Sequence, residues 1–289
     1  MLPANDDLTR YLQSAFFDPI QSLQIANERL RRQPGSGEAH LLAFMSHAEL
    51  LVTTLDDRDR TLAKTHYEKA VALNSRLSLF PTTFIAEELI GVGGFSYVFK
   101  VTKGASPMAL KVFKRCILIS DATWETFTET LERLGRCRSP YIVAVLEILK
   151  QRTSQEQSFF YVNEYVDGQS LRRWLQRRPN KDASPTHIPL TWYLEVLTIG
   201  SHIAKGLKAA HDCDVLHLDL KPENVLIEQT PDGVRAKLID FNFVTLQRSG
   251  IATLSFRPLQ TSFRYMAPEA IDKIDRACGF RGMAISVPN

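Results

Sequence analysis

The sequence is poor in cysteine, and its four cysteines form no recognisable site. They are Cys116, Cys137, Cys213 and Cys278 among 289 residues, with no C-x-x-C pair and no histidine at zinc-ligand spacing. Sparse, unpatterned cysteines are typical of reduced thiols in a cytosolic protein rather than of a disulfide scaffold or a zinc module. We therefore expect four reduced thiols and a cytoplasmic location.

Long hydrophobic runs are also absent. The first ten residues carry two aspartates and lack the apolar core of a secretory signal. The most apolar segment, residues 141–149, is interrupted by Glu147 and is far shorter than the roughly 20 residues that a membrane-spanning helix needs. These absences predict a soluble chain that does not bind a membrane.

The chain has little net charge of either sign. Its 35 basic and 32 acidic residues give a formal charge of +3. Such a small charge argues against a polyanion-binding surface, so we expect no nucleic-acid partner. A hydrophobic content of 44% and a charged content of 23% are close to globular averages, and the length suffices for one large domain or two smaller ones.

The first eighty residues predict paired helices and contain no catalytic constellation. Apolar residues recur at helical spacing in three stretches, residues 23–30, 39–51 and 62–73. In the last stretch Ala63, Tyr67 and Ala70 have the spacing of the second helix of a tetratricopeptide repeat, which this region resembles. Two interpretations stay open. The helices form either a surface that docks a protein partner or a cap packed on the following domain.

The stretch with the most chemical information is VLHLDLKPENVLI, residues 215–227. It places Asp219, Lys221 and Asn224 on a loop between apolar segments, which hold polar side chains in fixed positions. A turn whose side chains only cap backbone groups is the alternative. The spacing resembles the catalytic loop of protein kinases, in particular of the Ser/Thr branch. The resemblance implies that Asp219 accepts the substrate hydroxyl proton, Lys221 stabilises the transferring phosphoryl group and Asn224 holds Mg²⁺.

A glycine-rich segment followed by a lysine extends this resemblance. Residues 91–98, GVGGFSYV, lie in β-prone sequence, and their glycines would let backbone amides approach phosphates. Tight hairpins also use glycine, so this pattern alone is weak. Lys111 follows on an apolar strand, where a buried lysine requires an anion. The pair resembles the kinase phosphate loop and its strand lysine, with Ser96 at the third glycine position.

A helix predicted over residues 122–134 should carry the carboxylate that pairs with Lys111. Its apolar stripe consists of Trp124, Phe127, Leu131 and Leu134. Three glutamates form an adjacent stripe, Glu125, Glu129 and Glu132. The spacing to the next turn of the family pattern favours Glu129, and we expect the other two to be solvated.

Residues 163–168, NEYVDG, resemble a kinase hinge, where backbone groups of Glu164 and Val166 would bind adenine. Asn163 then falls at the gatekeeper position, which is usually apolar in that family. The resemblance implies that ATP is bound by Gly91, Val92, Gly93, Gly94, Val98, Ala109, Lys111, Glu164, Val166 and Leu226.

Two later motifs follow in the order in which protein kinases have them. Residues 237–242, KLIDFN, resemble the kinase DFG element, in which Asp240 would bridge Mg²⁺ to the phosphates. Residues 265–269, YMAPE, resemble the end of the activation segment. Besides Ser96 and Asn163, three further positions depart from the family pattern: Leu218, Asn242 and Thr261. Leu218 replaces an arginine that pairs with an activation-loop phosphate, which argues against that mode of switching but leaves phosphoryl transfer possible.

The motifs together predict an α+β fold. We expect a two-lobed, protein-kinase-like domain with a β-rich N-lobe and an α-rich, incomplete C-lobe, preceded by an all-α helical-hairpin region. The predicted boundaries are 1–80 for the helical region and 81–289 for the kinase-like domain, divided into an N-lobe (81–166) and a partial C-lobe (167–289). Few residues follow the last motif, so the C-lobe is short for the family.

Two functions follow from the resemblance. The first is a serine/threonine kinase that uses ATP and Mg²⁺ and acts on a protein substrate. The second is a pseudokinase or truncated scaffold that binds nucleotide or presents its helices to a partner.

Overall fold

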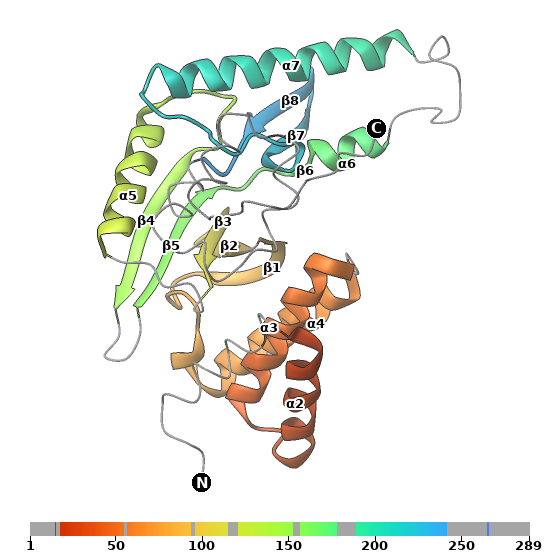
Figure 1. Ribbon diagram of the computed structural model, residues 1–289, viewed down its shortest axis with the longest axis vertical. Helices are drawn as coiled ribbons and strands as arrows, with labels where there is room; N and C mark the ends of the chain where they lie inside the picture. Colours follow the sequence, from red (N-terminus) through yellow and green to blue (C-terminus); the bar gives the residue numbers. More distant parts are fainter. Residues whose placement is uncertain are drawn as a thin grey trace, which may run out of the picture.

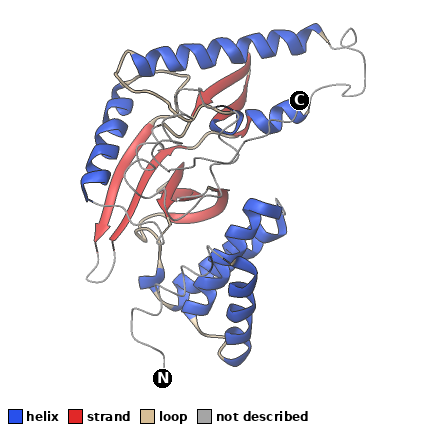
Figure 2. Ribbon diagram, viewed as in Figure 1, coloured by secondary structure: helices blue, strands red, loops and turns tan. Residues whose placement is uncertain are grey.

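The computed structural model describes residues 15, 18–54, 57–93, 96–114, 121–152, 157–177, 189–241 and 265. Figure 1 shows three tiers, which are the N-terminal helices, a five-stranded sheet flanked by one helix, and a smaller sheet beneath a long helix. Colouring by secondary structure separates the all-helical first tier from the mixed tiers that follow (Figure 2). The predicted α+β class and two-lobed arrangement are confirmed.

The first tier consists of three helices, α2 (Pro19–Arg32), α3 (Gly37–Thr54) and α4 (Asp57–Leu73). Helix α2 begins where the Asp18 carboxylate accepts a hydrogen bond from the Gln21 amide at 2.9 Å, with Pro19 in the first turn. The Ser36 hydroxyl accepts likewise from the Ala39 amide at 3.2 Å, at the start of α3. Each stretch predicted from helical spacing lies within one of these helices.

The middle tier is an antiparallel sheet in the order β1-β2-β3-β5-β4. Its strands are β1 (Ile85–Val92), β2 (Ser96–Lys103), β3 (Ser106–Phe113), β4 (Val145–Arg152) and β5 (Gln157–Glu164). The register aligns Val98, Lys111 and Tyr161 side by side, so their side chains project from one face, which we call the cleft face. Tyr97 and Val112 project from the opposite, outer face. Helix α5 (Asp121–Arg136) packs on the cleft face.

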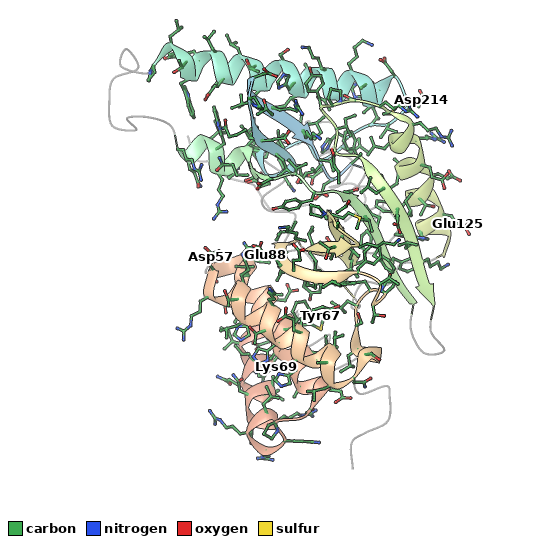
Figure 3. The ribbon with its side chains drawn as sticks, turned by 180° about the vertical axis from the view of Figure 1, so that it is seen from behind. Asp57, Tyr67, Lys69, Glu88, Glu125 and Asp214 are labelled. Atoms are coloured by element: carbon green, nitrogen blue, oxygen red, sulfur yellow. A yellow bond between two sulfur atoms is a disulfide. The ribbon has the colours of Figure 1, made fainter. Side chains whose placement is uncertain are left out.

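The outer face of the sheet is covered by α3 and α4. The Phe44 ring of α3 lies 5.2 Å from Tyr97 and 6.0 Å from Phe99, and the Tyr67 ring of α4 lies 5.2 Å from Phe99, between ring centroids. One continuous buried core contains all four rings, and Figure 3 labels Tyr67 at this boundary. The helices therefore form a cap on the N-lobe, as one of the two interpretations expected.

The third tier contains two helices and a three-stranded sheet: α6 (Leu171–Gln176), α7 (Leu190–His211), β6 (Gly168–Ser170), β7 (Val225–Thr230) and β8 (Gly233–Leu238). Helix α7 approaches β8 closely at Gly206, where a Cβ atom would lie 2.9 Å from both the Tyr141 carbonyl oxygen and Leu238 Cδ1. After α7, Asp214, labelled in Figure 3, adopts φ +57° in the turn that follows the helix. None of the described helices is long and apolar enough to cross a membrane.

Two cysteines are paired, contrary to the expectation of reduced thiols. Cys137, after α5, and Cys213, after α7, form a disulfide with Cα atoms 6.3 Å apart. The expectation was wrong because these residues are separated by 76 positions in sequence. Only the packing of the two helix ends brings them within bonding range. Cys116 and Cys278 lie outside the described residues.

Candidate active site

The three side chains predicted for the catalytic loop lie together. Lys221 Nζ is 2.8 Å from Asp219 Oδ2. Asn224 Nδ2 donates to Asp219 Oδ2 at 3.0 Å and to the Asp219 carbonyl oxygen at 2.8 Å. Capping of a backbone carbonyl is therefore only part of the arrangement, since Asn224 also contacts the carboxylate. The loop presents one carboxylate whose Oδ2 atom is held by both the Lys221 cation and the Asn224 amide.

The flanks of this loop fix it to the C-lobe sheet. A short 3₁₀ helix, η3 (Pro222–Asn224), leads into β7, whose first residue, Val225, is buried. The Ile239 amide donates to the Asn224 carbonyl oxygen at 3.0 Å. This bond holds Asn224 beside the residue that precedes Asp240, so both predicted magnesium ligands have a common backbone anchor.

His217 supports the loop, although sequence reasoning gave it no role. Its side chain is buried, and the ring lies 4.5 Å from the Phe241 ring. Burial lowers the pKa of His217, which favours the neutral imidazole. The next residue, Leu218, adopts φ +61°, a conformation that costs a bulky side chain about 1–3 kcal/mol. A packed His217 therefore helps to hold strained backbone immediately before Asp219.

Lys111 pairs with Asp240 across the lobes. The Lys111 Nζ atom is 2.6 Å from Asp240 Oδ1, with 5% and 28% of the two side chains exposed. The pair offsets the cost of the buried Lys111 charge, while the Asp240 carboxylate is also partly open to solvent. On the same face, burial and then the Asp240 charge raise the pKa of Tyr161 well above its ordinary value. The Tyr161 hydroxyl is therefore neutral beside the ion pair.

The expected ion pair between Lys111 and Glu129 is wrong for this structure. Glu129 is exposed, and so are Glu125 and Glu132. The apolar stripe of α5 faces the sheet, and at 3.6 residues per turn Glu129 lies roughly opposite the centre of that stripe. Figure 3 shows Glu125 on the outer side of α5. Buried Phe127 occupies the sheet side instead, 5.7 Å from the Tyr161 ring.

The glycine-rich segment forms the predicted hairpin. Gly91 and Val92 end β1, opposite Val98 and Tyr97 of β2. The Gly93 amide donates to the Ser96 carbonyl oxygen at 2.9 Å, which closes the turn. Gly94 lies outside the described residues.

The residues predicted to bind adenine come from both lobes. Val98 lies opposite Lys111, and Ala109 lies opposite Asn163 on β5, so all four share the cleft face. Leu226 is half-buried on β7 in the C-lobe.

Glu164, in the predicted hinge, is anchored through its side chain. Its Oε1 atom accepts from Lys237 Nζ at 2.6 Å and from the Ala144 amide at 3.2 Å. Val166 is buried two residues later. Asn163 Oδ1 is buried and has no hydrogen-bond partner among the described residues, in the wall of a small cavity that also contacts Asp240.

The residues fit a magnesium nucleotide. Both hydrogen bonds of the Asn224 amide nitrogen go to Asp219, which leaves the Oδ1 atom of Asn224 as an acceptor. Asp240 offers a carboxylate from the neighbouring strand end. Magnesium prefers oxygen ligands, and in nucleotide sites it needs only one or two carboxylates besides phosphates and water. Lys111 supplies a phosphate-binding cation on the opposite lobe.

Several predicted positions cannot be placed. Asn242, Thr261 and residues 266–269 lie outside the described residues. Tyr265 is described, and its hydroxyl accepts a hydrogen bond from Arg172 Nη2 at 2.6 Å.

Comparisons with known proteins show which family the chain resembles. A family model for the protein kinase domain matches residues 84–280. Receptor protein kinase WSS1 of Oryza sativa subsp. japonica is 31% identical over 191 residues, which cover 64% of this chain and 19% of that protein. Serine/threonine-protein kinase pkn3 of Myxococcus xanthus is 30% identical over 171 residues, which cover 56% of this chain and 28% of that protein. The chain thus spans less than a third of the length of either relative. Among solved structures, the kinase domain of PknI from Mycobacterium tuberculosis aligns at 24% identity with a TM-score of 0.44, over 55% of this chain and 59% of that one.

Proposed function

The chain belongs to the protein kinase family, and from that membership we propose that it transfers the γ-phosphoryl group of Mg-ATP to a serine or threonine hydroxyl of a protein. The observation that carries the proposal is the arrangement of Asp219, Lys221 and Asn224 on one loop, tied by a backbone bond to the segment that bears Asp240.

Asp219 is the group that receives the substrate proton. Its carboxylate is fixed by Lys221 and Asn224, so it is oriented before a hydroxyl arrives, and such preorganisation is a large part of catalysis. Lys221 lies close enough to the carboxylate to stabilise negative charge that develops on a phosphoryl group beside it.

Asn224 and Asp240 are the proposed magnesium ligands, through the free amide oxygen and the carboxylate. When bound, Mg-ATP supplies the phosphoryl group and the divalent charge that neutralises it. The hairpin from Gly91 to Val98 and Lys111 would hold the phosphates, and the backbone of Glu164 to Val166 would hold adenine.

The Lys111–Asp240 ion pair has a consequence for binding. Lys111 and Asp240 neutralise each other in this structure. Both have separate roles in the proposed complex, since Lys111 meets phosphates and Asp240 meets the cation. Nucleotide binding therefore replaces one buried ion pair with two new electrostatic contacts, and a bound nucleotide should separate the two side chains.

A second candidate function is a nucleotide-binding or partner-binding scaffold, in which the N-terminal helices dock a protein. One observation favours it, which is the exposure of Glu129 and the absence of a glutamate from α5 beside Lys111. A site that binds nucleotide without catalysing transfer would retain the contacts of Lys111 and Asp240 and have no use for the Asp219 carboxylate.

One variant separates the two functions. Replacement of Asp219 by Asn keeps the size and polarity of the side chain and removes the proton acceptor. We expect ATP-dependent labelling of casein on serine and threonine by the parent chain. The variant should lose at least about a hundredfold in rate, with the Kd for a fluorescent ATP analogue unchanged within about threefold. Full turnover by the variant would contradict the role of Asp219. Nucleotide binding without transfer by the parent would favour the scaffold.

A further inference from the structure

The N-terminal helices are attached to each strand that carries the phosphate loop and its lysine. On β1, the Leu89 carbonyl oxygen accepts from Arg60 Nη1 of α4 at 2.6 Å. On β2, the Tyr97 hydroxyl donates to Glu49 Oε1 of α3 at 3.2 Å. After β3, Lys114 Nζ lies 2.5 Å from the same Glu49 oxygen. A single carboxylate of the helical cap therefore joins the second strand of the hairpin to the strand of Lys111.

These attachment points lie close to the nucleotide-binding elements along the chain. Tyr97 is paired with Val92, next to the turn that Gly93 closes. Lys114 follows Lys111 by three residues, so it projects from the outer face while Lys111 projects from the cleft face. Lys111 and Lys114 project from opposite faces of the same sheet, and a shift of β2 against β3 at Glu49 would change the position of the hairpin relative to Lys111.

Because the Glu49–Lys114 pair is buried, its two side chains must stay in contact. The Lys114 side chain is fully buried and only 10% of the Glu49 side chain is exposed. The Lys114 ammonium also lies 5.1 Å from the centre of the Tyr97 ring. A buried pair contributes little net stability compared with an apolar pair, but removal of one partner leaves an uncompensated charge. Such a pair therefore specifies position more than it adds stability.

We propose that Glu49 is a positioning residue for nucleotide binding. Through Tyr97 and Lys114 it fixes the spacing of β2 and β3, and thereby the phosphate loop and Lys111. The helical cap is then part of the nucleotide-binding machinery, and it acts from the face of the sheet that nucleotide does not touch. This inference rests on the proposed function insofar as nucleotide binds at the cleft face.

The test compares three variants with the parent chain. Glu49→Gln removes the charge and keeps the shape. The double variant Glu49→Leu with Lys114→Met removes both charges, so it retains a folded cap if the single variant is too unstable. The matched control is Glu28→Gln, since Glu28 is 60% exposed on α2 and its ion pair among the described residues is with its neighbour Arg32. All chains are compared at a temperature at which circular dichroism shows them folded.

The first readout is the Kd for Mg-ATP together with the KM for ATP and for the protein substrate. We expect Glu49→Gln and the double variant to weaken ATP binding and raise the KM for ATP by about tenfold, while the KM for the protein substrate changes less than about twofold. Glu28→Gln should match the parent. An unchanged Kd in variants that only melt at a lower temperature would overturn the inference and leave the proposed function intact.

The second readout needs no nucleotide. Amide hydrogen exchange of residues 89–93 and 96–98 should be faster in Glu49→Gln than in Glu28→Gln, because the hairpin loses its anchor. Equal exchange in these two variants would overturn the positioning role, even for a parent chain that binds no ATP.

Discussion

Two lysines at the end of β3 show how the two faces of the N-lobe sheet differ. Lys111 projects into the cleft and pairs with Asp240 of the C-lobe, whose side chain is 28% exposed. Lys114 projects from the outer face and pairs with Glu49 of the helical cap, in a pair that is 0% and 10% exposed. Both are charged side chains on an apolar strand, and both meet a carboxylate from a distant segment.

The surroundings of each pair decide what it does. The Lys111 pair borders a cavity and joins two lobes, so its partners can separate when a phosphate and a cation offer replacements. The Lys114 pair is buried beside the aromatic core shared by the cap and the sheet, with the Lys114 ammonium 5.1 Å from the centre of the Tyr97 ring. The ion pair at the cleft can exchange its partners for a ligand. The buried ion pair holds the two segments that it joins at a fixed spacing.

The comparison predicts the largest loss of stability at Lys114. Replacement by Met leaves Glu49 buried without its cation, which should lower the free energy of unfolding by about 3–5 kcal/mol. Urea denaturation followed by circular dichroism measures this. Addition of Glu49→Leu to the same chain should recover most of the loss. A single variant as stable as the parent would mean that the two pairs do not differ as described.

Replacement of Lys111 by Met should lower the phosphoryl-transfer rate strongly and the stability only slightly. Asp240 is partly exposed and can be solvated, so the stability should change by less than about 1 kcal/mol. The phosphoryl-transfer rate should fall by about 10²–10³-fold, since a preorganised cation at the phosphates is lost. Steady-state assays at several ATP concentrations measure this. A variant with normal turnover would remove Lys111 from the proposed site.

The helical cap should weaken on acidification because of a histidine cluster between α3 and α4. His40 Nδ1 lies 2.8 Å from His66 Nδ1, and His47 Nδ1 lies 2.8 Å from Asp59 Oδ1. Burial, then His40, His47 and Lys69, lower the pKa of His66 to about 4, and burial also lowers the pKa of His40. The unfolded chain, with an ordinary histidine pKa of about 6.5, then binds more protons between pH 6.5 and 4.

Stability is therefore fully present above pH 6.5 and decreases as the pH falls toward 4. For His66 we expect a loss of about 1–2 kcal/mol by pH 5. Denaturation midpoints at pH 7.5 and 5.0 measure it, with the exposed His211→Gln as a control that should behave as the parent. His66→Phe should show a smaller pH dependence. If His66→Phe lost as much stability between pH 7.5 and 5.0 as the parent, the pH dependence would come from titratable groups other than His66.

The smallest effect is expected at Glu129. Since its side chain is exposed on the outer side of α5, Glu129→Gln should leave the transfer rate and the Kd for ATP within about twofold of the parent. Kinetic assays measure this, with Lys111→Met assayed in parallel as the variant that should lose activity. A large loss would show that Glu129 reaches Lys111 in the working enzyme.

Motif order and local spacing carried most of the prediction from sequence. Asp219, Lys221 and Asn224 are neighbours along a short loop, so their proximity follows from spacing alone. The hairpin at Gly91 and the helices of the cap have local periods that the sequence displays directly.

What the sequence did not reveal depends on contacts between distant segments. Glu129 was misassigned because a count along the chain does not determine which side of a helix faces a sheet. The Cys137–Cys213 disulfide and the Glu49–Lys114 pair have no local signal, since each joins residues from different parts of the fold. Glu49 resembles any other helix-surface glutamate until the burial of its partner is known.

Intact-mass spectrometry of a protein substrate after incubation with Mg-ATP and the purified chain tests the central claim most directly. The account predicts added phosphate with the parent chain and none with Asp240→Ala, which lacks a proposed magnesium ligand and the partner of Lys111. Substrate that stays unmodified by a folded, nucleotide-binding parent would contradict the proposed phosphoryl transfer. Equal phosphate with both chains would contradict the role given to Asp240.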